Sequence, residues 1–321
     1  MKMRSIDAIA SDPILKEDVL NRVGKFKGNL VSDLSLLSAK DFLSRHRPGN
    51  TLSAEEKVYE SIILLIGRPV LTILHGTFQV PESEEWCKKL IKSRSLLETA
   101  IRSVGRVEAV NVPGYEWLGT AWIVRDDIIV TNAHVARIFA SKVSEGKFEF
   151  KQNFRNERMK ARLDTREEID QVEEIEYLVT DILYISESEN TDLAFLRVKR
   201  LSEDAIDLPQ GIPISDNIIE TTVDIAVIGY PARDSRAVTA EMSQIFGDIY
   251  DVKRMSLGTV SSTQWPGILR HDCCTLGGNS GSPLIDLNTG KVLGMHFCGG
   301  TTETGNGAVS AALIKKVLDG L

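Results

Sequence analysis

The sequence predicts an all-β sandwich or barrel over residues 105–321, preceded by a mainly helical region over residues 1–104. Short apolar runs separated by turn residues recur through the longer part, among them WLGTAWIV, IIVTNAHV, DLAFLRV and KVLGMHF. Such spacing is typical of sandwiches and barrels, whereas alternating strand and helix patterns would indicate a parallel sheet. In the first part, apolar residues recur every three or four positions within 14–23 and 58–66, which predicts amphipathic helices.

Two of the expected helices have recognisable starts. Ser53 precedes Glu56 at capping-box spacing, ahead of the apolar run VYESIILLI. Ser83 stands before a second long helical pattern that reaches about Ser103. A hydroxyl at such a position accepts a hydrogen bond from an unpaired N–H group of the first turn, so both serines are predicted helix caps.

Three further segments complete the expected outline. Residues 69–80, PVLTILHGTFQV, predict a strand or a short hairpin around Gly76. Residues 141–190 are polar, and they are expected to form a long excursion between two barrel strands. The run Ala311–Leu318 predicts a last helix that packs its leucine and valine side chains on the barrel.

The composition is that of an ordinary soluble globular protein, with 42% hydrophobic and 26% charged residues. The net charge of -7 argues against a general binder of nucleic acid or of anionic membranes. No apolar stretch reaches the length of about 18 residues that a membrane-spanning helix needs. Charges interrupt the N-terminal sequence MKMRSIDAIASDPILKEDVL, which is unlike a signal peptide, so a cytoplasmic location is expected.

The four cysteines, Cys87, Cys273, Cys274 and Cys298, are too few for a disulfide framework in a chain of 321 residues. They also lack the paired CxxC spacing of a structural zinc site. We therefore expect free thiols and no metal.

The segment GGNSGSP, residues 277–283, is the strongest indication of chemistry. A serine hydroxyl is a poor nucleophile unless a base takes its proton and donors stabilise the oxyanion. Glycines on both sides of Ser280 permit a tight turn that exposes the hydroxyl and lets N–H groups converge, those of Gly278 and Ser280 being the expected donors. By itself the segment could also be a glycine-rich hairpin.

Two other segments supply the groups that such a serine requires. His134 lies at the end of the strand pattern IIVTNAHV, where an imidazole is well placed to act as a general base. Asp192 begins the apolar run DLAFLRV, where a carboxylate needs a hydrogen-bonding partner, and His134 would be one. The histidines His46, His75 and His271 lie outside comparable motifs and are expected to be structural.

Together these segments resemble the trypsin-like, chymotrypsin-fold serine proteases, in which His, Asp and Ser follow in the same order. The resemblance covers about residues 105–320 and implies a double six-stranded β barrel. It implies a serine endopeptidase that hydrolyses protein or peptide substrates through an acyl-enzyme, with the triad His134, Asp192 and Ser280 and an oxyanion hole at Gly278 and Ser280. No metal or organic cofactor is implied.

Two departures separate the chain from the digestive enzymes of this family. Those enzymes have an aspartate before the nucleophile that pairs with a new N-terminus after zymogen cleavage, whereas this chain has Asn279. Activation by that route is therefore not expected. Val135 replaces the usual disulfide cysteine after the histidine, which suits a reducing compartment.

The nucleophile segment is closer to that of the bacterial glutamyl-endopeptidase-like branch, with GNSGSP, a threonine five residues before the serine, and a G-x-H strand. The resemblance implies that Thr275 and a protonated His296 hold an acidic side chain of the substrate, since both can donate hydrogen bonds to a carboxylate. Cys274, Cys298 and Gly299 are expected to border this pocket. A purely structural role for His296 is the alternative.

Two questions stay open at the level of the sequence. The chain could be a protease-like binding or scaffold module that no longer cleaves. Residues 1–104 loosely resemble the extra N-terminal parts of bacterial cytoplasmic trypsin-like proteins linked to effector or defence systems, which implies docking of a partner protein. An extension that only stabilises the barrel is the alternative.

Overall fold

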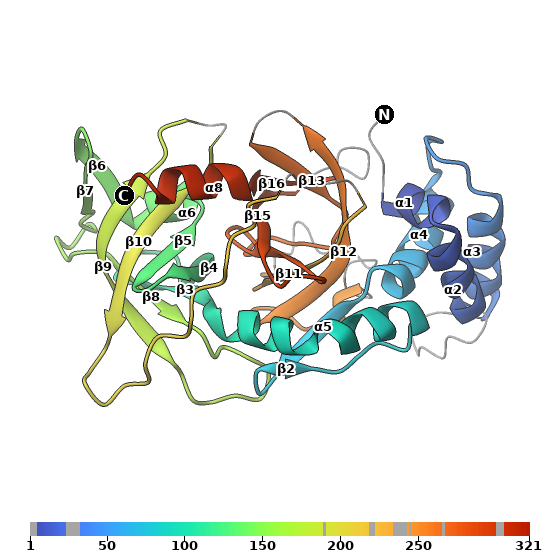
Figure 1. Ribbon diagram of the computed structural model, residues 1–321, viewed down its shortest axis with the longest axis horizontal. Helices are drawn as coiled ribbons and strands as arrows, with labels where there is room; N and C mark the ends of the chain where they lie inside the picture. Colours follow the sequence, from blue (N-terminus) through green and yellow to red (C-terminus); the bar gives the residue numbers. More distant parts are fainter. Residues whose placement is uncertain are drawn as a thin grey trace.

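The computed structural model describes residues 5–23, 33–188, 191–217, 222–233, 243, 245–264, 267–299 and 305–321. Figure 1 shows three parts along the longest axis of the molecule: a bundle of helices at one end, a β barrel in the middle and a second β barrel at the other end. The chain begins in the bundle, passes along the middle barrel as a long helix, builds the far barrel and then returns to build the middle one.

The helical bundle consists of α1 (Ser5–Ser11), α2 (Pro13–Val23), α3 (Asp33–Arg45) and α4 (Ala54–Gly67). The predicted capping box is confirmed: Ser53 Oγ accepts a hydrogen bond from Glu56 N, and the Glu56 carboxylate accepts one from Ser53 N. The bundle has an apolar core of its own, formed by Ile6, Ile9, Leu15, Val19, Val23, Leu36, Ala39, Phe42, Leu43, Ile62, Ile63 and Ile66.

The predicted hairpin around Gly76 is confirmed, and it is also joined to a barrel. Strands β1 (Val70–Leu74) and β2 (Thr77–Phe78) pair across a turn at His75 and Gly76, both of which have positive φ. Strand β1 in addition pairs antiparallel with β12 (Arg254–Gln264) of the middle barrel. The hairpin thus fastens the end of α4 to the protease-like part of the chain.

Helix α5 (Glu84–Ser103) is capped by Ser83 as predicted, with Ser83 Oγ accepting a hydrogen bond of 3.1 Å from Trp86 N. The buried side chains of α5, among them Trp86, Leu90 and Leu97, lie in the same apolar core as residues of both barrels. Deleting residues 1–100 would therefore remove part of the barrel core together with the bundle.

The far barrel is closed by six antiparallel strands in the order β10, β5, β4, β3, β8, β9. The bounds of these strands are β3 (Val104–Val110), β4 (Trp117–Arg125), β5 (Ile128–Thr131), β8 (Lys160–Asp164), β9 (Glu176–Ile185) and β10 (Ala194–Arg200). Helix α6 (Ala133–Phe139) follows β5, and a separate hairpin is formed by β6 (Ala140–Ser144) and β7 (Lys147–Phe150).

The expectation of a long loop over residues 141–190 is wrong, because this segment contributes β8 and β9 to the barrel. Several side chains of β9 are only half-buried or exposed, so its sequence, EYLVTDILYI, carries charged and polar residues between the apolar ones. Strands with one face toward water are expected to alternate in this way.

The middle barrel is also closed by six antiparallel strands, because β11 and β12 pair with each other at the two ends of the series β11, β14, β15, β16, β13, β12. Its further bounds are β11 (Asp224–Gly229), β13 (Ile268–His271), β14 (Pro283–Asp286), β15 (Val292–Cys298) and β16 (Asn306–Ser310). Helix α8 (Ala311–Leu318) ends the fold as predicted. The chymotrypsin-like double barrel is thus confirmed.

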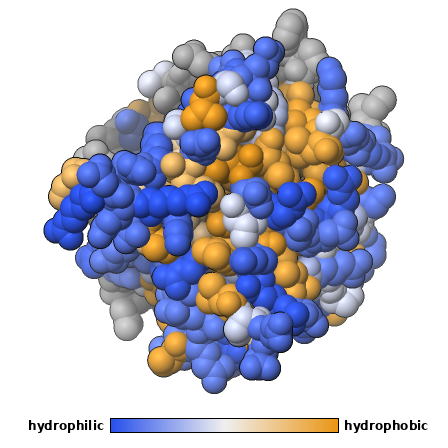
Figure 2. Space-filling model, turned by 90° about the vertical axis from the view of Figure 1, so that its left-hand side faces the viewer, coloured by the Kyte–Doolittle hydropathy of each residue, from blue (hydrophilic) through white to orange (hydrophobic). Residues whose placement is uncertain are grey.

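The surface of the far barrel is mixed in character. Figure 2 shows this end of the molecule, where hydrophobic residues reach the surface in several places between hydrophilic ones. In the described part of the chain, no helix is both long and apolar enough to cross a membrane.

Candidate active site

The structure brings His134 and Asp192 into direct contact. Asp192 lies just before β10, which pairs with β5, and His134 lies in the first turn of α6, directly after β5. The carboxylate binds the histidine twice: Oδ1 accepts a hydrogen bond of 2.9 Å from the backbone N–H, and Oδ2 lies 2.5 Å from Nδ1. The side chain of Asn132 donates to the Asp192 carbonyl at 2.8 Å. Three hydrogen-bonding contacts thus fix the His134 imidazole relative to the Asp192 carboxylate.

The loop that carries Ser280 is a tight turn between Leu276 and Asn279. The N–H group of Asn279 donates to the Leu276 carbonyl at 3.2 Å, and Gly278, the third residue of the turn, has a φ of +85°. A side chain at this position would be strained, and its Cβ would meet the carbonyl oxygen of Tyr230. The sequence signal, a glycine two residues before the serine, therefore has a steric cause.

Ser280 lies beside the segment that carries His134. Its carbonyl accepts a hydrogen bond of 2.8 Å from the N–H group of Thr120 in β4. Gly119 lies between Ser280 and the segment that carries His134. An added Cβ at Gly119 would lie 3.0 Å from the side chain of Val135 and 3.1 Å from the Ser280 carbonyl oxygen. Within the described residues no hydrogen bond joins Ser280 Oγ to His134. In unliganded enzymes this bond is often long, and it tightens when substrate binds.

The peptide group between Gly277 and Gly278 is held in one orientation. The carbonyl oxygen of Gly277 accepts a hydrogen bond of 2.6 Å from the N–H group of Ala232. Because a trans peptide group directs its N–H opposite to its C=O, the Gly278 N–H points away from Ala232. In the described part of the chain, neither Gly278 N nor Ser280 N takes part in a backbone hydrogen bond, so both donors are available.

Thr120 holds the next peptide group of the loop. Its hydroxyl donates to the Gly278 carbonyl at 2.8 Å and accepts from the Tyr230 N–H at 3.2 Å. Sequence reasoning missed both Thr120 and Ala232. Ala232 acts through its backbone, which leaves no signal in residue type.

His296 is fully packed, and it pairs with a second histidine. Its ring is 2% exposed, and its Nδ1 lies 3.1 Å from Nε2 of His271, which is also buried. Burial lowers the pKa of His296 well below 6.5, and the nearby His271 and His134 lower it further. Burial likewise lowers the pKa of His271 to about 3. The expectation of a protonated His296 is therefore wrong for the free protein, in which both rings are neutral at neutral pH.

The hydrogen-bond partners of the pair assign the tautomers. His271 Nδ1 is buried without a partner in the described part of the chain. A buried acceptor without a partner is tolerated better than a buried N–H group without one. We therefore assign the proton of His271 to Nε2, which donates to His296 Nδ1 and leaves Nε2–H as the donor of His296. His271 was expected to be structural, and it lies at the end of β13, where it sets this donor.

The remaining residues of the expected pocket differ in where they lie. Thr275 Oγ1 is buried and has no hydrogen-bond partner among the described residues. Cys298 is half-buried at the end of β15, and the exposed Gly299 follows it. Cys274 instead points away: its Sγ lies 3.8 Å from the Arg68 carbonyl, it packs in a separate apolar cluster, and burial raises its pKa to about 12.

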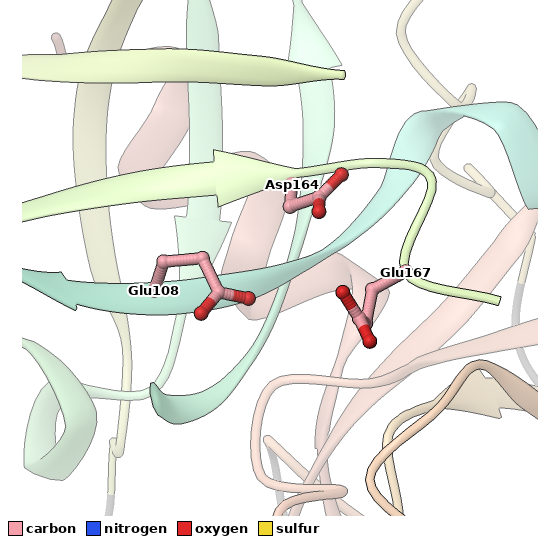
Figure 3. Close-up of side chains that lie close together, drawn as sticks. All are labelled: Glu108, Asp164 and Glu167. Carbon is pink, nitrogen blue, oxygen red and sulfur yellow. The ribbon is translucent and has the colours of Figure 1, made fainter. Parts of the chain in front are cut away.

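The side chains of Glu108, Asp164 and Glu167 lie close together (Figure 3), and each has a carboxylate oxygen within 4.8 Å of the others. Arg106 binds two of them, with Nε 2.5 Å from Glu108 and a terminal nitrogen 3.3 Å from Glu167. Burial raises the pKa of all three carboxyl groups. Because an arginine already supplies the positive charge, this set of donors fits a bridged ion-pair network and not a metal site.

This network supports the loop that carries Ser280 from the side. The guanidinium of Arg106 lies over the ring of Trp117, 5.5 Å from its centre. The same ring lies where a Cβ of Gly278 would be. Trp117 is thus packed between the network and the loop that precedes Ser280.

Comparison with known proteins places this site in a family. Residues 119–295 match the model of the trypsin-like peptidase domain. No curated protein matches the chain significantly.

Three solved structures illustrate the likeness. The serine endoprotease from Yersinia pestis is 20% identical, with 71% of this chain and 65% of that one covered and a TM-score of 0.47. A protease from M. tuberculosis in its active form is 18% identical, with coverages of 72% and 85% and a TM-score of 0.46. A Glu endopeptidase is 16% identical, with coverages of 68% and 89% and a TM-score of 0.45. The family match spans more than half of the sequence, so the chain belongs to the trypsin-like peptidase domain family.

Proposed function

We propose that the protein is a serine endopeptidase with Ser280 as nucleophile, His134 as general base and Asp192 as the residue that orients the base. The observation that carries the proposal is the double contact of Asp192 with the backbone N–H and Nδ1 of His134. A neutral imidazole with its proton on Nδ1 has its free electron pair on Nε2, which is the form that accepts a proton from serine.

The reaction follows from these roles. Ser280 Oγ attacks the scissile carbonyl while His134 Nε2 takes the hydroxyl proton, and the resulting oxyanion accepts hydrogen bonds from the N–H groups of Gly278 and Ser280. His134 then gives the proton to the leaving amine, and the acyl-enzyme remains. Water attacks the ester in the second half, with His134 again accepting and returning a proton.

We further propose that the site prefers an acidic residue on the acyl side of the scissile bond. Thr275 Oγ1 is a buried hydroxyl without a partner among the described residues, and His296 keeps a donor at Nε2. A carboxylate would accept a hydrogen bond from each of them. The donor on His296 is a neutral imidazole, so the carboxylate needs no prior protonation of the ring.

Active-site labelling tests the proposal. A fluorophosphonate probe should label the wild-type chain at Ser280, located by mass spectrometry, and Ser280→Ala should lose both labelling and peptide cleavage. Ser282→Ala, two residues further along the same loop, is the matched control and should keep both. A wild-type chain that neither reacts with the probe nor cleaves a peptide library would favour the silent binding module.

Specificity needs a second comparison. Paired peptides that differ only in Glu or Gln before the scissile bond have nearly the same shape and differ in charge. Faster cleavage of the Glu peptide supports the acidic preference, and equal rates contradict it.

A further inference from the structure

A buried ion pair joins the helical bundle to the segment that forms the proposed pocket. Arg68 follows α4 directly, and its Nε and one terminal nitrogen lie 3.0 and 2.7 Å from Oδ2 of Asp272. The two side chains are 1% and 2% exposed. The partners are 204 positions apart in the sequence. The pair is thus a long-range contact between the two parts of the chain.

Asp272 belongs to residues 271–276, the segment next to the proposed pocket, which we call the pocket segment. It follows His271, which fixes the tautomer of His296, and it precedes Thr275 by three residues. Residues 272–276 lie outside any strand, so few ladder hydrogen bonds hold them and side-chain contacts contribute to their placement. Asp272 Oδ1 accepts a hydrogen bond of 2.6 Å from Thr259 N, and its own N–H donates to the Thr259 carbonyl.

Arg68 is itself fixed from several sides. Its N–H group donates to the Leu64 carbonyl at 2.7 Å, and its second terminal nitrogen donates to the Gly67 carbonyl at 3.1 Å. The ring of Trp86 lies 5.9 Å from its guanidinium and donates from Nε1 to the same Gly67 carbonyl. On the other side, Cys274 Sγ lies 3.8 Å from the Arg68 carbonyl. Arg68 therefore touches the pocket segment through both its side chain and its backbone.

Because both side chains are buried, the charge of Arg68 and the charge of Asp272 each need the other as a partner. A carboxylate that loses its partner inside a protein retains the cost of leaving water, so it either moves toward solvent or takes up a proton. Asp272 and Cys273 pack closely against Gly258 of β12: an added Cβ there would meet Asp272 Oδ1 and would lie 2.7 Å from Cys273 Sγ. Movement of Asp272 would therefore disturb the contacts of its neighbour Cys273.

We propose that Arg68 is a positioning residue for substrate specificity: through Asp272 it holds His271, which fixes the tautomer of His296, and Thr275. The Nε2–H of His296 and the Thr275 hydroxyl are then the donors to an acidic substrate side chain. This rests on the function proposed above. It assigns to the helical bundle a role in shaping the pocket, because the cation that orders the pocket segment comes from the end of α4.

A set of full-length variants tests the role. Arg68→Met removes the charge and keeps much of the volume, and Arg68→Lys keeps the charge. The double variant Arg68→Met/Asp272→Asn leaves no charge buried without a partner. It replaces Arg68→Met in the test if that single variant does not fold. Asp7→Asn is the matched control, because Asp7 is paired with His46 at 2.7 Å and the two side chains are equally buried, at 2% and 1% exposed.

The readouts separate positioning from general stability. For Arg68→Met we expect kcat/KM on a Glu peptide to fall about tenfold or more, mostly through KM, with fluorophosphonate labelling of Ser280 within about threefold of wild type. Arg68→Lys should recover part of the loss, and Asp7→Asn should change neither. Hydrogen exchange at residues 271–276 should quicken in Arg68→Met and stay unchanged in Asp7→Asn.

Three results would overturn the proposal. The first is an equal loss of Glu-peptide cleavage, Gln-peptide cleavage and probe labelling in Arg68→Met, and the second is no loss in any of them. The third is faster exchange spread evenly over both barrels. If the wild-type chain neither cleaves nor reacts, the proposed function fails on its own. Hydrogen exchange at residues 271–276 then still decides whether Arg68 orders the segment.

Discussion

The backbone N–H of Ala232 donates a hydrogen bond of 2.6 Å to the carbonyl oxygen of Gly277. This contact crosses from the segment after β11 to the loop that carries Ser280, the proposed nucleophile, and it sets the direction of the Gly278 N–H. Without this contact, a loop with two adjacent glycines could rotate this peptide group, because glycine has no Cβ and adopts many backbone conformations. The proposed oxyanion hole therefore depends on an alanine that takes no part in the chemistry itself.

Ala232→Pro tests this dependence, because proline has no N–H to donate. We expect kcat to fall about 10²–10³-fold with little change in KM, as when one oxyanion donor is lost. Ala232→Gly keeps the N–H and should stay close to wild type. A proline variant that folds, as judged by circular dichroism, and retains full kcat would show that the Gly278 N–H needs no such anchor.

Gly278→Ala tests the steric argument for the same loop. The added methyl group would meet the Tyr230 carbonyl and the Trp117 ring, and the residue would have to keep a φ of +85°. We expect at least about a 10²-fold loss of kcat and a loss of about 1–3 kcal/mol in the free energy of unfolding.

Gly277→Ala is the matched control for that variant. An added Cβ at Gly277 meets no atom within 4 Å, and this residue is not among those with positive φ. It should therefore keep both activity and stability. Similar losses in the two variants would contradict the steric explanation.

The sequence alone predicted those features of this site that depend on the type of residue at a position. A glycine-flanked serine, a histidine at a strand end and an aspartate before an apolar strand each carry a chemical reason, and the structure brings His134 and Asp192 into contact. Local signals also predicted the capping box at Ser53 and the bounds of α8.

Long-range contacts were beyond the reach of the sequence. The pairing of β1 with β12 and the ion pair of Arg68 with Asp272 join segments about 180–200 residues apart, and nothing local distinguishes these residues from others of their type. The strands within 141–190 were missed because their outward side chains are polar. The tautomer of His296 depends on His271, which only the folded chain brings beside it.

Thr275→Val tests whether the buried hydroxyl of Thr275 donates a hydrogen bond to the substrate carboxylate. A hydrogen bond to a charged group contributes about 1.5–3 kcal/mol, so we expect kcat/KM for a Glu peptide to fall roughly 10–100-fold. The free energy of unfolding should stay the same or rise, because the hydroxyl has no partner to lose among the described residues. Thr275→Ser keeps the hydroxyl and should retain the preference for Glu over Gln. Clear destabilisation by valine would instead point to an internal partner for Thr275.

The buried histidines predict how stability depends on pH. Burial lowers the pKa of His271 to about 3, whereas in the unfolded chain a histidine has a pKa near 6.5. Below pH 6.5 the unfolded state binds a proton that the folded state does not, so stability falls as the pH falls from 6.5 toward 3. At pH 5 this single group lowers the free energy of unfolding by about 2 kcal/mol.

His271→Gln removes that titration and isolates it from the other groups. Urea unfolding at pH 7.5 and pH 5 should therefore show a loss on acidification that is about 2 kcal/mol smaller in the variant than in the wild type. His296 stays in both proteins and titrates in the same direction. Its pKa is lowered less once His271 is absent, which also makes the loss on acidification smaller in the variant. Equal losses in the two proteins would mean that His271 takes up its proton in the folded state as readily as in the unfolded one. The neutral pair assigned to the pocket would then be excluded.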